Sequence, residues 1–374
     1  MRIAIVGTEL CAVDGGGGGL EQVLRRWAAA LAERHEVIVV SHRLCGHAPT
    51  AGTAVVDPFV TVMLEHTTEL GTVLRRLAPD VVSLHNRPQW AAQVPAASTT
   101  AVTFHNYSQA WKLDEAPHGQ AWATARLVAF SAVSKALAGA AADRLGLSPG
   151  TVAVTPPSID PVYLDGRRWD PGPVVLAPNR LLRKKGVLEL LDVARQERFG
   201  GLTFAFADLI SPWARPTLEH EALRAAVSEV RNAELFEPAK APVALAERYR
   251  RCAVVVCPVN EEEGLGLVAL EAQACGVPLV TTDLGGLREA TFPPNVCVPA
   301  GDAGGLADAI ALATAGLSTA GLSTGPPPAA PVVGDLMRDR AGARRLVATN
   351  YSPEASARVF ERWLQAAVAK HASV

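Results

Sequence analysis

Short runs of β-branched residues alternate with longer stretches rich in Ala, Leu and Arg along most of the chain. The first strand-like runs lie at residues 3–6, 37–41, 81–84, 101–104, 128–133 and 152–155. Between the first two, the apolar residues of stretch 20–34 recur at helical spacing. This alternation predicts βαβ units and a parallel sheet, because a crossover helix must carry the chain back between parallel strands. Strands that are apolar throughout fit a sheet covered on both faces.

The alternation breaks at residues 155–172, TPPSIDPVYLDGRRWDPG, where four prolines and two glycines predict a connector. Strand-like runs then resume at residues 174–177, 203–207, 253–257, 279–282 and 296–298. A chain of 374 residues is long enough for two domains. The sequence therefore predicts an α/β protein of two Rossmann-like, doubly wound parallel-sheet domains, residues 1–157 and 173–350, joined by a connector at 158–172.

Two later segments stand apart from this pattern. Residues 316–334 contain a small duplication and a proline run, which predict a flexible surface insert without a catalytic role. The final segment, 351–374, is predicted to be a helix, with Ser352 as its cap and Pro353 in its first position.

Composition narrows the class of partner and the compartment. The formal net charge of −2 leaves no basic surplus to neutralise phosphates, which argues against nucleic acid as the main partner. The start, MRIAIVGTEL, lacks the features of a signal peptide, and no run of about 20 apolar residues occurs. We therefore expect a cytoplasmic protein without an integral membrane segment. The six cysteines form no CxxC pair and are expected to be mostly buried free thiols.

The strand at 252–257 leads into a glycine turn and then a helix that begins near Leu267. Open α/β sheets bind ligands at the carboxyl ends of their strands. The unpaired N–H groups at a helix start favour an anion such as a diphosphate. Gly264 and Gly266 would let the backbone approach that anion closely. The expected donor-binding residues of this turn are Gly264, Leu265, Gly266, Leu267 and Val268.

Glu263 lies just before this helix, and Glu271 lies in its first turns. A carboxylate at the position of Glu271 can accept both hydroxyls of a ribose diol, and Glu263 can hold hydroxyls of a second ring. This spacing suits a nucleotide sugar, which has phosphates between two hydroxylated rings. The residues alone leave a second interpretation open, in which both glutamates only favour the positive end of the helix dipole.

The stretch EGLGLVALEAQACGVPLVTTDLGGLRE resembles the glutamate–x7–glutamate signature of glycosyltransferase family 4 over nearly thirty positions. The resemblance implies the GT-B fold, in which two Rossmann-like domains face each other across a cleft, with the donor nucleotide on the C-terminal domain and the acceptor on the N-terminal one. It implies that Glu263 and Glu271 bind the donor. It also implies that the final helix, 351–374, packs back on the N-terminal domain.

The segment APNRLLRKKG follows the first strand of the second domain and holds several cations. Arg180 and Lys185 at a strand end could clamp a diphosphate and stabilise its departure, with Lys184 as an alternative to Lys185. The segment resembles the phosphate-binding segment of the same family. Asn179 departs from that pattern, since the family usually has glycine there. A solvated basic helix start remains the alternative.

The first strand of the chain ends in the glycine-rich loop AVDGGGGGLEQVLRRW. A glycine loop between a strand and a helix can cradle phosphates, although this one is not the GxGxxG dinucleotide fingerprint, which argues against an NAD-dependent dehydrogenase. A bare run of glycines can also be a mobile turn. The resemblance implies that the loop closes over donor phosphates and acceptor, with Gly16, Gly17, Gly18 and Gly19 as the expected contacts.

Two strand ends of the first domain carry histidines. In TFHNYSQAW, the resemblance places His105 near the hydroxyls of the transferred sugar, as a residue of the catalytic set with Arg180, Lys185 and Glu263. In SLHNRPQW, the residues His85, Asn86 and Arg87 are candidates to line the acceptor pocket, although turn chemistry before a proline accounts for them equally well.

The resemblance implies a retaining hexosyltransferase. It would move a sugar from a nucleotide-diphosphate sugar, with a UDP-sugar favoured, to a hydroxyl of a small-molecule, saccharide or natural-product acceptor. No DxD sequence occurs, so neither a metal nor a cofactor is expected. Peripheral membrane contact and oligomeric state stay open. The alternatives are a nucleotide-sugar epimerase of the same fold and a noncatalytic nucleotide-sugar-binding protein.

Overall fold

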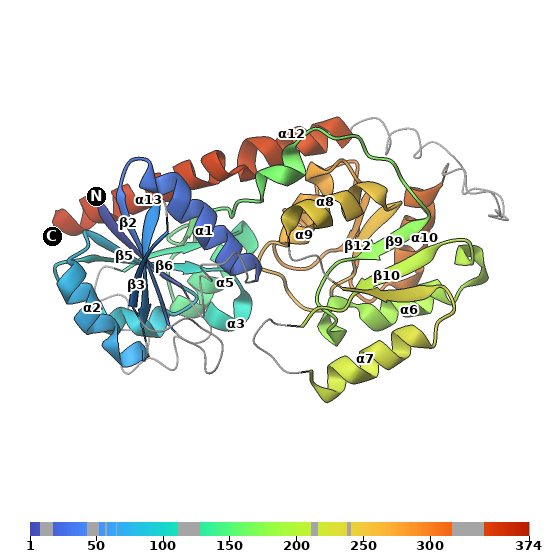
Figure 1. The fold of residues 1–374 in the computed structure, drawn as a ribbon, viewed down its shortest axis with the longest axis horizontal. Helices are drawn as coiled ribbons and strands as arrows, with labels where there is room; N and C mark the ends of the chain where they lie inside the picture. The colour runs from blue at the N-terminus through green and yellow to red at the C-terminus, as the bar shows by residue number, and fades with distance from the viewer. Residues whose placement is uncertain are drawn as a thin grey trace. The chain divides into compact units, whose positions relative to one another are not determined.

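The computed structural model describes residues 1–7, 18–42, 52–56, 58–64, 66–110, 128–210, 216–237, 241–315 and 340–373. They form two compact units: unit 1 is Met1–Ser158 with Pro353–Val374, and unit 2 is Ile159–Ser352. Each unit contains a largely parallel sheet with helices packed around it (Figure 1). The prediction of two Rossmann-like α/β domains is therefore confirmed. The insert predicted at 316–334 lies outside the described residues.

The sheet of unit 1 has the strand order β3-β4-β2-β1-β5-β6-β7-β8 and is parallel except where β3 pairs with β4. Its strands are β1 (Arg2–Val6), β2 (Glu36–His42), β3 (Gly52–Val56), β4 (Phe59–Leu64), β5 (Val81–His85), β6 (Thr99–Phe104), β7 (Ala129–Ala132) and β8 (Ala153–Val154). The expected strands match these elements within two residues at each end. The sequence analysis missed β3 and β4, which form an antiparallel hairpin at the sheet edge.

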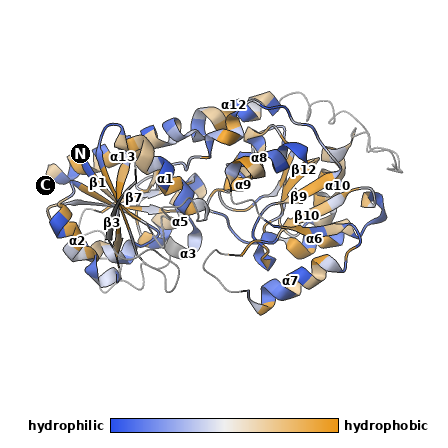
Figure 2. Cartoon of the chain, in the orientation of Figure 1, coloured by the Kyte–Doolittle hydropathy of each residue, from blue (hydrophilic) through white to orange (hydrophobic). Residues whose placement is uncertain are grey.

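The helices of unit 1 are α1 (Gly19–Ala32), α2 (Leu70–Leu77), α3 (Tyr107–Ala110), α5 (Lys135–Leu145) and α13 (Pro353–Ala372), with 3₁₀ turns at Thr67–Glu69 and Pro88–Gln93. One face of α1 is apolar at helical spacing, and Trp27 on that face is fully buried. In both units the strands are the most hydrophobic segments, as Figure 2 shows, because helices cover them.

The C-terminal helix α13 packs against α1 within unit 1. The ring of Phe360 stacks on that of Trp27 with 4.1 Å between centroids, and Trp27 Nε1 donates to Ser356 Oγ at 2.6 Å. Ser356 Oγ in turn donates to the carbonyl of Pro156 at 2.6 Å. Farther along, Glu361 accepts hydrogen bonds from Arg34. The last helix therefore completes the core of the N-terminal unit.

The sheet of unit 2 is parallel throughout, with the order β11-β10-β9-β12-β13-β14. Its strands are β9 (Val174–Ala177), β10 (Thr203–Ala207), β11 (Ala233–Phe236), β12 (Val254–Cys257), β13 (Leu279–Thr282) and β14 (Val296–Val298). Its helices are α6 (Val187–Ala194), α7 (Leu218–Ser228), α8 (Pro242–Arg251), α9 (Leu267–Ala274), α10 (Ala303–Thr314) and α12 (Arg340–Tyr351), with 3₁₀ turns at Pro161–Leu164, Arg183–Lys185 and Glu197–Phe199. The edge strand β11 was not expected, because its pattern is only partly apolar.

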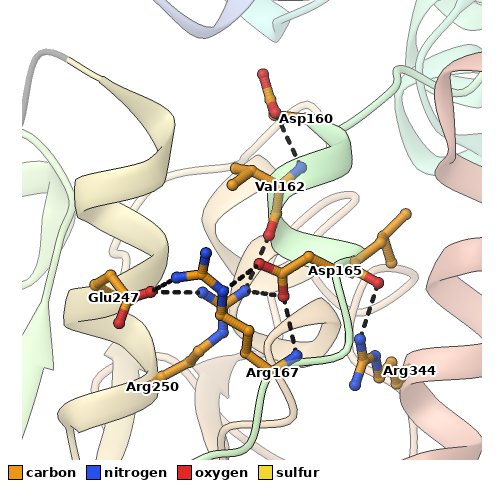
Figure 3. Close-up of polar contacts among 8 residues, drawn as sticks. Asp160, Val162, Asp165, Arg167, Glu247, Arg250 and Arg344 are labelled. Carbon is orange, nitrogen blue, oxygen red and sulfur yellow. Dashed lines mark hydrogen bonds and ion pairs between the residues drawn. The ribbon is translucent and has the colours of Figure 1, made fainter.

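The segment predicted as a connector is built into unit 2 from Ile159 onward. Arg250 of α8, only 3% exposed, donates to the carbonyl of Val162 at 2.9 Å and to Asp165 Oδ1 at 2.7 Å. Figure 3 shows this cluster, in which Arg167 also pairs with Asp165 and Arg344 of α12 donates to the connector. A buried ion pair therefore fixes the connector to α8, and a hydrogen bond from Arg344 to the carbonyl of Leu164 links it to α12.

Candidate active site

The predicted phosphate-binding and sugar-binding segments follow two adjacent strands of unit 2. β9 pairs with β10 on one side and with β12 on the other, so the strand order reverses between β9 and β12. Loops that follow the strands at such a switch point flank the usual ligand site of an open α/β sheet. Arg180 and Lys185 lie in the segment after β9, and Glu263 lies in the segment after β12.

These two segments touch each other, and a glycine makes the approach feasible. Gly186 has φ +72°, and a Cβ there would lie 1.7 Å from the carbonyl oxygen of Pro258. The backbone N–H of Asn260 donates to the carbonyl of Lys184 at 2.9 Å. Any side chain at position 186 would therefore push the segments apart. Gly186 keeps the cations after β9 within reach of the carboxylates after β12.

Lys185 forms an ion pair with Glu263 across this junction. The two side chains are 12% and 25% exposed, so the pair is shielded from solvent more than an ordinary surface pair. Burial first, and then the charges of Arg180 and Lys184, lower the pKa of Lys185 to about 8. The nearby charge of Glu261 acts in the opposite direction, because an opposite charge favours the protonated amine. The structure thus brings together two of the predicted residues.

Arg180 and Asn179 border a small cavity beside Lys185. The cavity has a volume of about 10 Å³, roughly that of one water molecule. Asn179 Nδ2 is buried and has no hydrogen-bond partner among the described residues. The Asn179 side chain also lies against the thiol of Cys257 and opposes the raising of the pKa of that thiol by burial, so Asn179 sits beside both Cys257 and the two cations. Lys184 is half-exposed and pairs with the exposed Glu261 at 3.4 Å, so Lys185 rather than Lys184 faces the cavity.

The helix α9 begins at Leu267, as predicted, and its cap is Gly266 with φ +94°. A Cβ at position 266 would lie 2.4 Å from Leu287 Cδ1, so the turn depends on glycine. No side chain caps this helix start. Its first N–H groups are therefore available to an anion. Of the predicted donor contacts, Gly264 and Leu265 are buried, while Gly266, Leu267 and Val268 are half-buried.

Glu271 is half-buried on α9, and Tyr249 of α8 donates its hydroxyl to Glu271 Oε2 at 2.9 Å. Tyr249 is fully buried. Burial first, and then the nearby charge of Glu271, raise the pKa of Tyr249 well above its ordinary value. The phenol therefore stays protonated and acts as a donor to the carboxylate. The sequence analysis missed Tyr249, because nothing in its local pattern links it to Glu271.

The described part of the glycine-rich loop is short. Gly16 and Gly17 lie outside the described residues. Gly18 caps α1 with an extended backbone, and Gly19 is the first residue of that helix. Gly18 makes no side-chain cap at the start of α1.

The two predicted histidines of unit 1 contact each other. His85 Nδ1 lies 3.0 Å from His105 Nε2, and His85 Nε2 lies 3.1 Å from Ser83 Oγ. Asn86, with φ +56°, accepts a hydrogen bond from the backbone N–H of His105 at 2.7 Å. Burial lowers the pKa of His105 to about 3 and that of His85 well below its ordinary value, so both imidazoles are neutral near neutral pH.

The burial of the residues expected to line the acceptor pocket differs, and their role there stays a prediction. His85 is 0% exposed and Asn86 is 3% exposed, so neither presents a surface to a ligand in this structure. Both are turned toward His105, which is half-buried. Arg87 is also half-buried and lies over the ring of Trp90 at 5.7 Å. His85 and Asn86 therefore hold His105 in place through their hydrogen bonds.

The structure also describes four of the cysteines and the lengths of the apolar helices. Cys252, Cys257 and Cys275 are buried free thiols, whereas Cys297 is free and exposed. Across the described ranges, no helix has both the length and the apolar character that a membrane crossing requires.

Two family models match this chain. The model described as Glycosyltransferase Family 4 matches residues 17–163, and the model described as Glycosyl transferases group 1 matches residues 167–316. The chain is 34% identical over 164 residues to a D-inositol 3-phosphate glycosyltransferase of Acidothermus cellulolyticus, a match that covers 40% of this chain and 36% of that protein. A protein of the same name from Kineococcus radiotolerans is 32% identical over 186 residues, which cover 44% and 41%. The chain thus matches well under half the length of these relatives.

Solved structures resemble the fold over nearly the whole chain. Sucrose-phosphate synthase from Thermosynechococcus elongatus superposes with a TM-score of 0.75 at 18% identity and covers 99% of both chains. HepE of Anabaena, solved in complex with UDP, has a TM-score of 0.66 at 14% identity and covers 98% of this chain and all of that one. At such identities the likeness concerns the fold, which is GT-B. With a matching family model on each of its two Rossmann-like units, the chain belongs to glycosyltransferase family 4.

Proposed function

We propose that the chain transfers a sugar from a nucleotide-diphosphate sugar, with a UDP-sugar as the first candidate, to a hydroxyl of a small-molecule or saccharide acceptor. The observation that carries this proposal is the convergence at one sheet edge of Lys185, Glu263 and an uncapped helix start. Relatives named as glycosyltransferases and a fold neighbour in complex with UDP support it.

In this proposal the diphosphate lies against Arg180, Lys185 and the start of α9. Two cations and a positive helix end oppose the charge that grows on the leaving diphosphate as the glycosidic bond breaks. This stabilisation is stronger in the transition state than in the bound donor, and it therefore raises the rate. Such a set of charges makes a divalent metal unnecessary, so we propose metal-independent transfer.

Glu271 is proposed to bind the ribose hydroxyls, and Glu263 the hydroxyls of the transferred sugar. A carboxylate has about four acceptor sites, which is enough to hold a diol and one protein donor together. From unit 1, His105 is proposed to bind another sugar hydroxyl. As a neutral imidazole it can donate through one ring nitrogen without adding charge. No side chain is assigned as a nucleophile, and the proposal includes retention of the anomeric configuration.

The acceptor is proposed to be a polyhydroxylated ring. The named relatives act on D-inositol 3-phosphate, and a cyclitol and a sugar present the same chemistry of adjacent ring hydroxyls. Both classes therefore belong in the first acceptor screen.

The test is thermal stabilisation by UDP, GDP, ADP and dTDP, each with EDTA, followed by turnover of the matching sugar donors. A ligand at about 100 times its Kd stabilises by roughly 2.7 kcal/mol. For a unit of this size that corresponds to a rise in Tm of about 5–10 °C. One clear winner and transfer of its sugar to an acceptor are expected. Interconversion of donor sugars without transfer would favour an epimerase, and stabilisation without turnover would favour a noncatalytic binder.

A further inference from the structure

Tyr249 and Glu271 form a buried polar contact between two neighbouring helices. The hydroxyl of Tyr249 donates to Glu271 Oε2 at 2.9 Å, and the tyrosine side chain is fully buried in unit 2. A buried hydroxyl without an acceptor would be costly, and here the carboxylate supplies that acceptor. The contact thus ties the position of Glu271 to that of α8.

The ring of Tyr249 is itself held in place. Tyr163 of the connector meets it edge-on, with ring centroids 5.9 Å apart and an interplanar angle of 69°. The connector is in turn fixed by the hydrogen bonds of Arg250 to Val162 and Asp165. The tyrosine hydroxyl is therefore a fixed donor, so it restricts the rotation of the Glu271 side chain.

We propose that Tyr249 is a positioning residue that holds the carboxylate of Glu271 in the orientation that binds a vicinal ribose diol. This inference rests on the function proposed above, in which Glu271 binds the nucleotide ribose. Tyr249 occupies one of the roughly four acceptor sites of the carboxylate. Restricting the carboxylate lowers the entropy lost when both hydroxyls bind together. Tyr249 is thereby a determinant of selectivity for ribonucleotides over deoxyribonucleotides.

Tyr249→Phe tests the inference, because it removes only the hydroxyl and keeps the ring that fills the core. Calorimetry would give the Kd of UDP, 2′-deoxy-UDP and 3′-deoxy-UDP for the wild type and the variant. The variant should bind UDP up to about tenfold more weakly, because the released carboxylate must be immobilised when the diol binds. It should bind the deoxy analogues with nearly unchanged Kd, so that the preference for UDP collapses.

Tyr351→Phe provides the matched control. Tyr351 is also largely buried in unit 2, and burial raises its pKa to about 12, but its neighbouring carboxylate is Glu289 and not Glu271. This control should keep the UDP preference of the wild type. As a readout without ligand, the ¹³C chemical shift of the Glu271 carboxylate should move in Tyr249→Phe and stay in place in Tyr351→Phe.

The outcomes separate the two proposals. If the wild type binds no nucleoside diphosphate, the proposed function and this inference both fail. If the wild type prefers UDP and Tyr249→Phe keeps that preference, only the inference is overturned. A variant that weakens UDP and both deoxy analogues equally would assign Tyr249 a purely structural role and would also overturn it.

Discussion

Replacing Glu263 with glutamine should tighten the binding of UDP, even though Glu263 is proposed to bind the donor. The Glu263 carboxylate contacts the Lys185 amine. An incoming diphosphate must take over that cation, and it meets the negative charge of Glu263 as it does so. Glutamine keeps the size of the side chain and removes the competing charge. The sugar hydroxyls are absent from UDP, so the loss of their partner does not enter this measurement.

The size of the effect follows from the exposure of the pair. Two unit charges about 4 Å apart interact by roughly 4 kcal/mol at an effective dielectric constant of about 20, which is an upper bound here. The measured interaction free energy is about 0.2–1 kcal/mol for exposed ion pairs and about 1.5 kcal/mol or more for close ion pairs at protein interfaces. With side chains 12% and 25% exposed, this pair lies between those classes. A gain of about 1.4 kcal/mol corresponds to a tenfold lower Kd.

The assay is calorimetric titration of UDP at about pH 6.5, where Lys185, with a pKa of about 8, is protonated. The gain from Glu263→Gln should shrink as the pH approaches 8, because Lys185 then loses the charge for which the carboxylate and the diphosphate compete. Glu261→Gln is the matched control, because Glu261 is 66% exposed and pairs with Lys184. It should change the Kd by less than about twofold. Equal or weaker UDP binding by Glu263→Gln would refute the argument that Glu263 competes with the diphosphate for Lys185.

Three further outcomes follow from the same structure. UDP affinity should fall as the pH rises through about 8, because Lys185 is charged below its pKa and neutral above it. Calorimetry across this range should show the fall in affinity, and Lys185→Arg should abolish it because arginine stays charged. Arg250→Leu should lower the free energy of unfolding of unit 2 by about 3 kcal/mol in urea titrations, because it leaves Asp165 without its buried partner. Ser356→Ala should cost unit 1 about 1–3 kcal/mol in the same assay, because it strands the buried Trp27 Nε1–H; no loss would mean that α13 contributes little to this core.

Apolar strand runs were enough to predict most of both sheets. Strand β12 is buried along its whole length, and its sequence VVVC is a continuous apolar run. Strand β11 lies at a sheet edge and is only partly buried, and its sequence AELF carries no such run. The strand at 59–64 follows Asp57 and Pro58, which read as a turn, and this concealed the hairpin.

The site was only partly predictable. The spacing of residues in one segment indicates which of them share a loop, but it does not indicate which residues of other elements contact them. Glu263 and Lys185 could be named from their positions after parallel strands, whose carboxyl ends share one sheet edge. Tyr249 could not, because its contact with Glu271 depends on how α8 packs near α9. The contacts of His85 could not be predicted for a related reason. A polar residue at a strand end suggests a pocket, but here Ser83 and His105 satisfy its ring.

The most direct test of the proposed function is the fate of the donor sugar. The nucleotide sugar chosen by the thermal series would be incubated with EDTA and a panel of sugar and cyclitol acceptors, and ¹H NMR would follow the anomeric proton. We predict an α-linked product from an α-linked donor, with turnover reduced more strongly than donor binding in Lys185→Ala, because the leaving charge grows in the transition state. A β-linked product, or a rate unaffected by Lys185→Ala, would contradict the account.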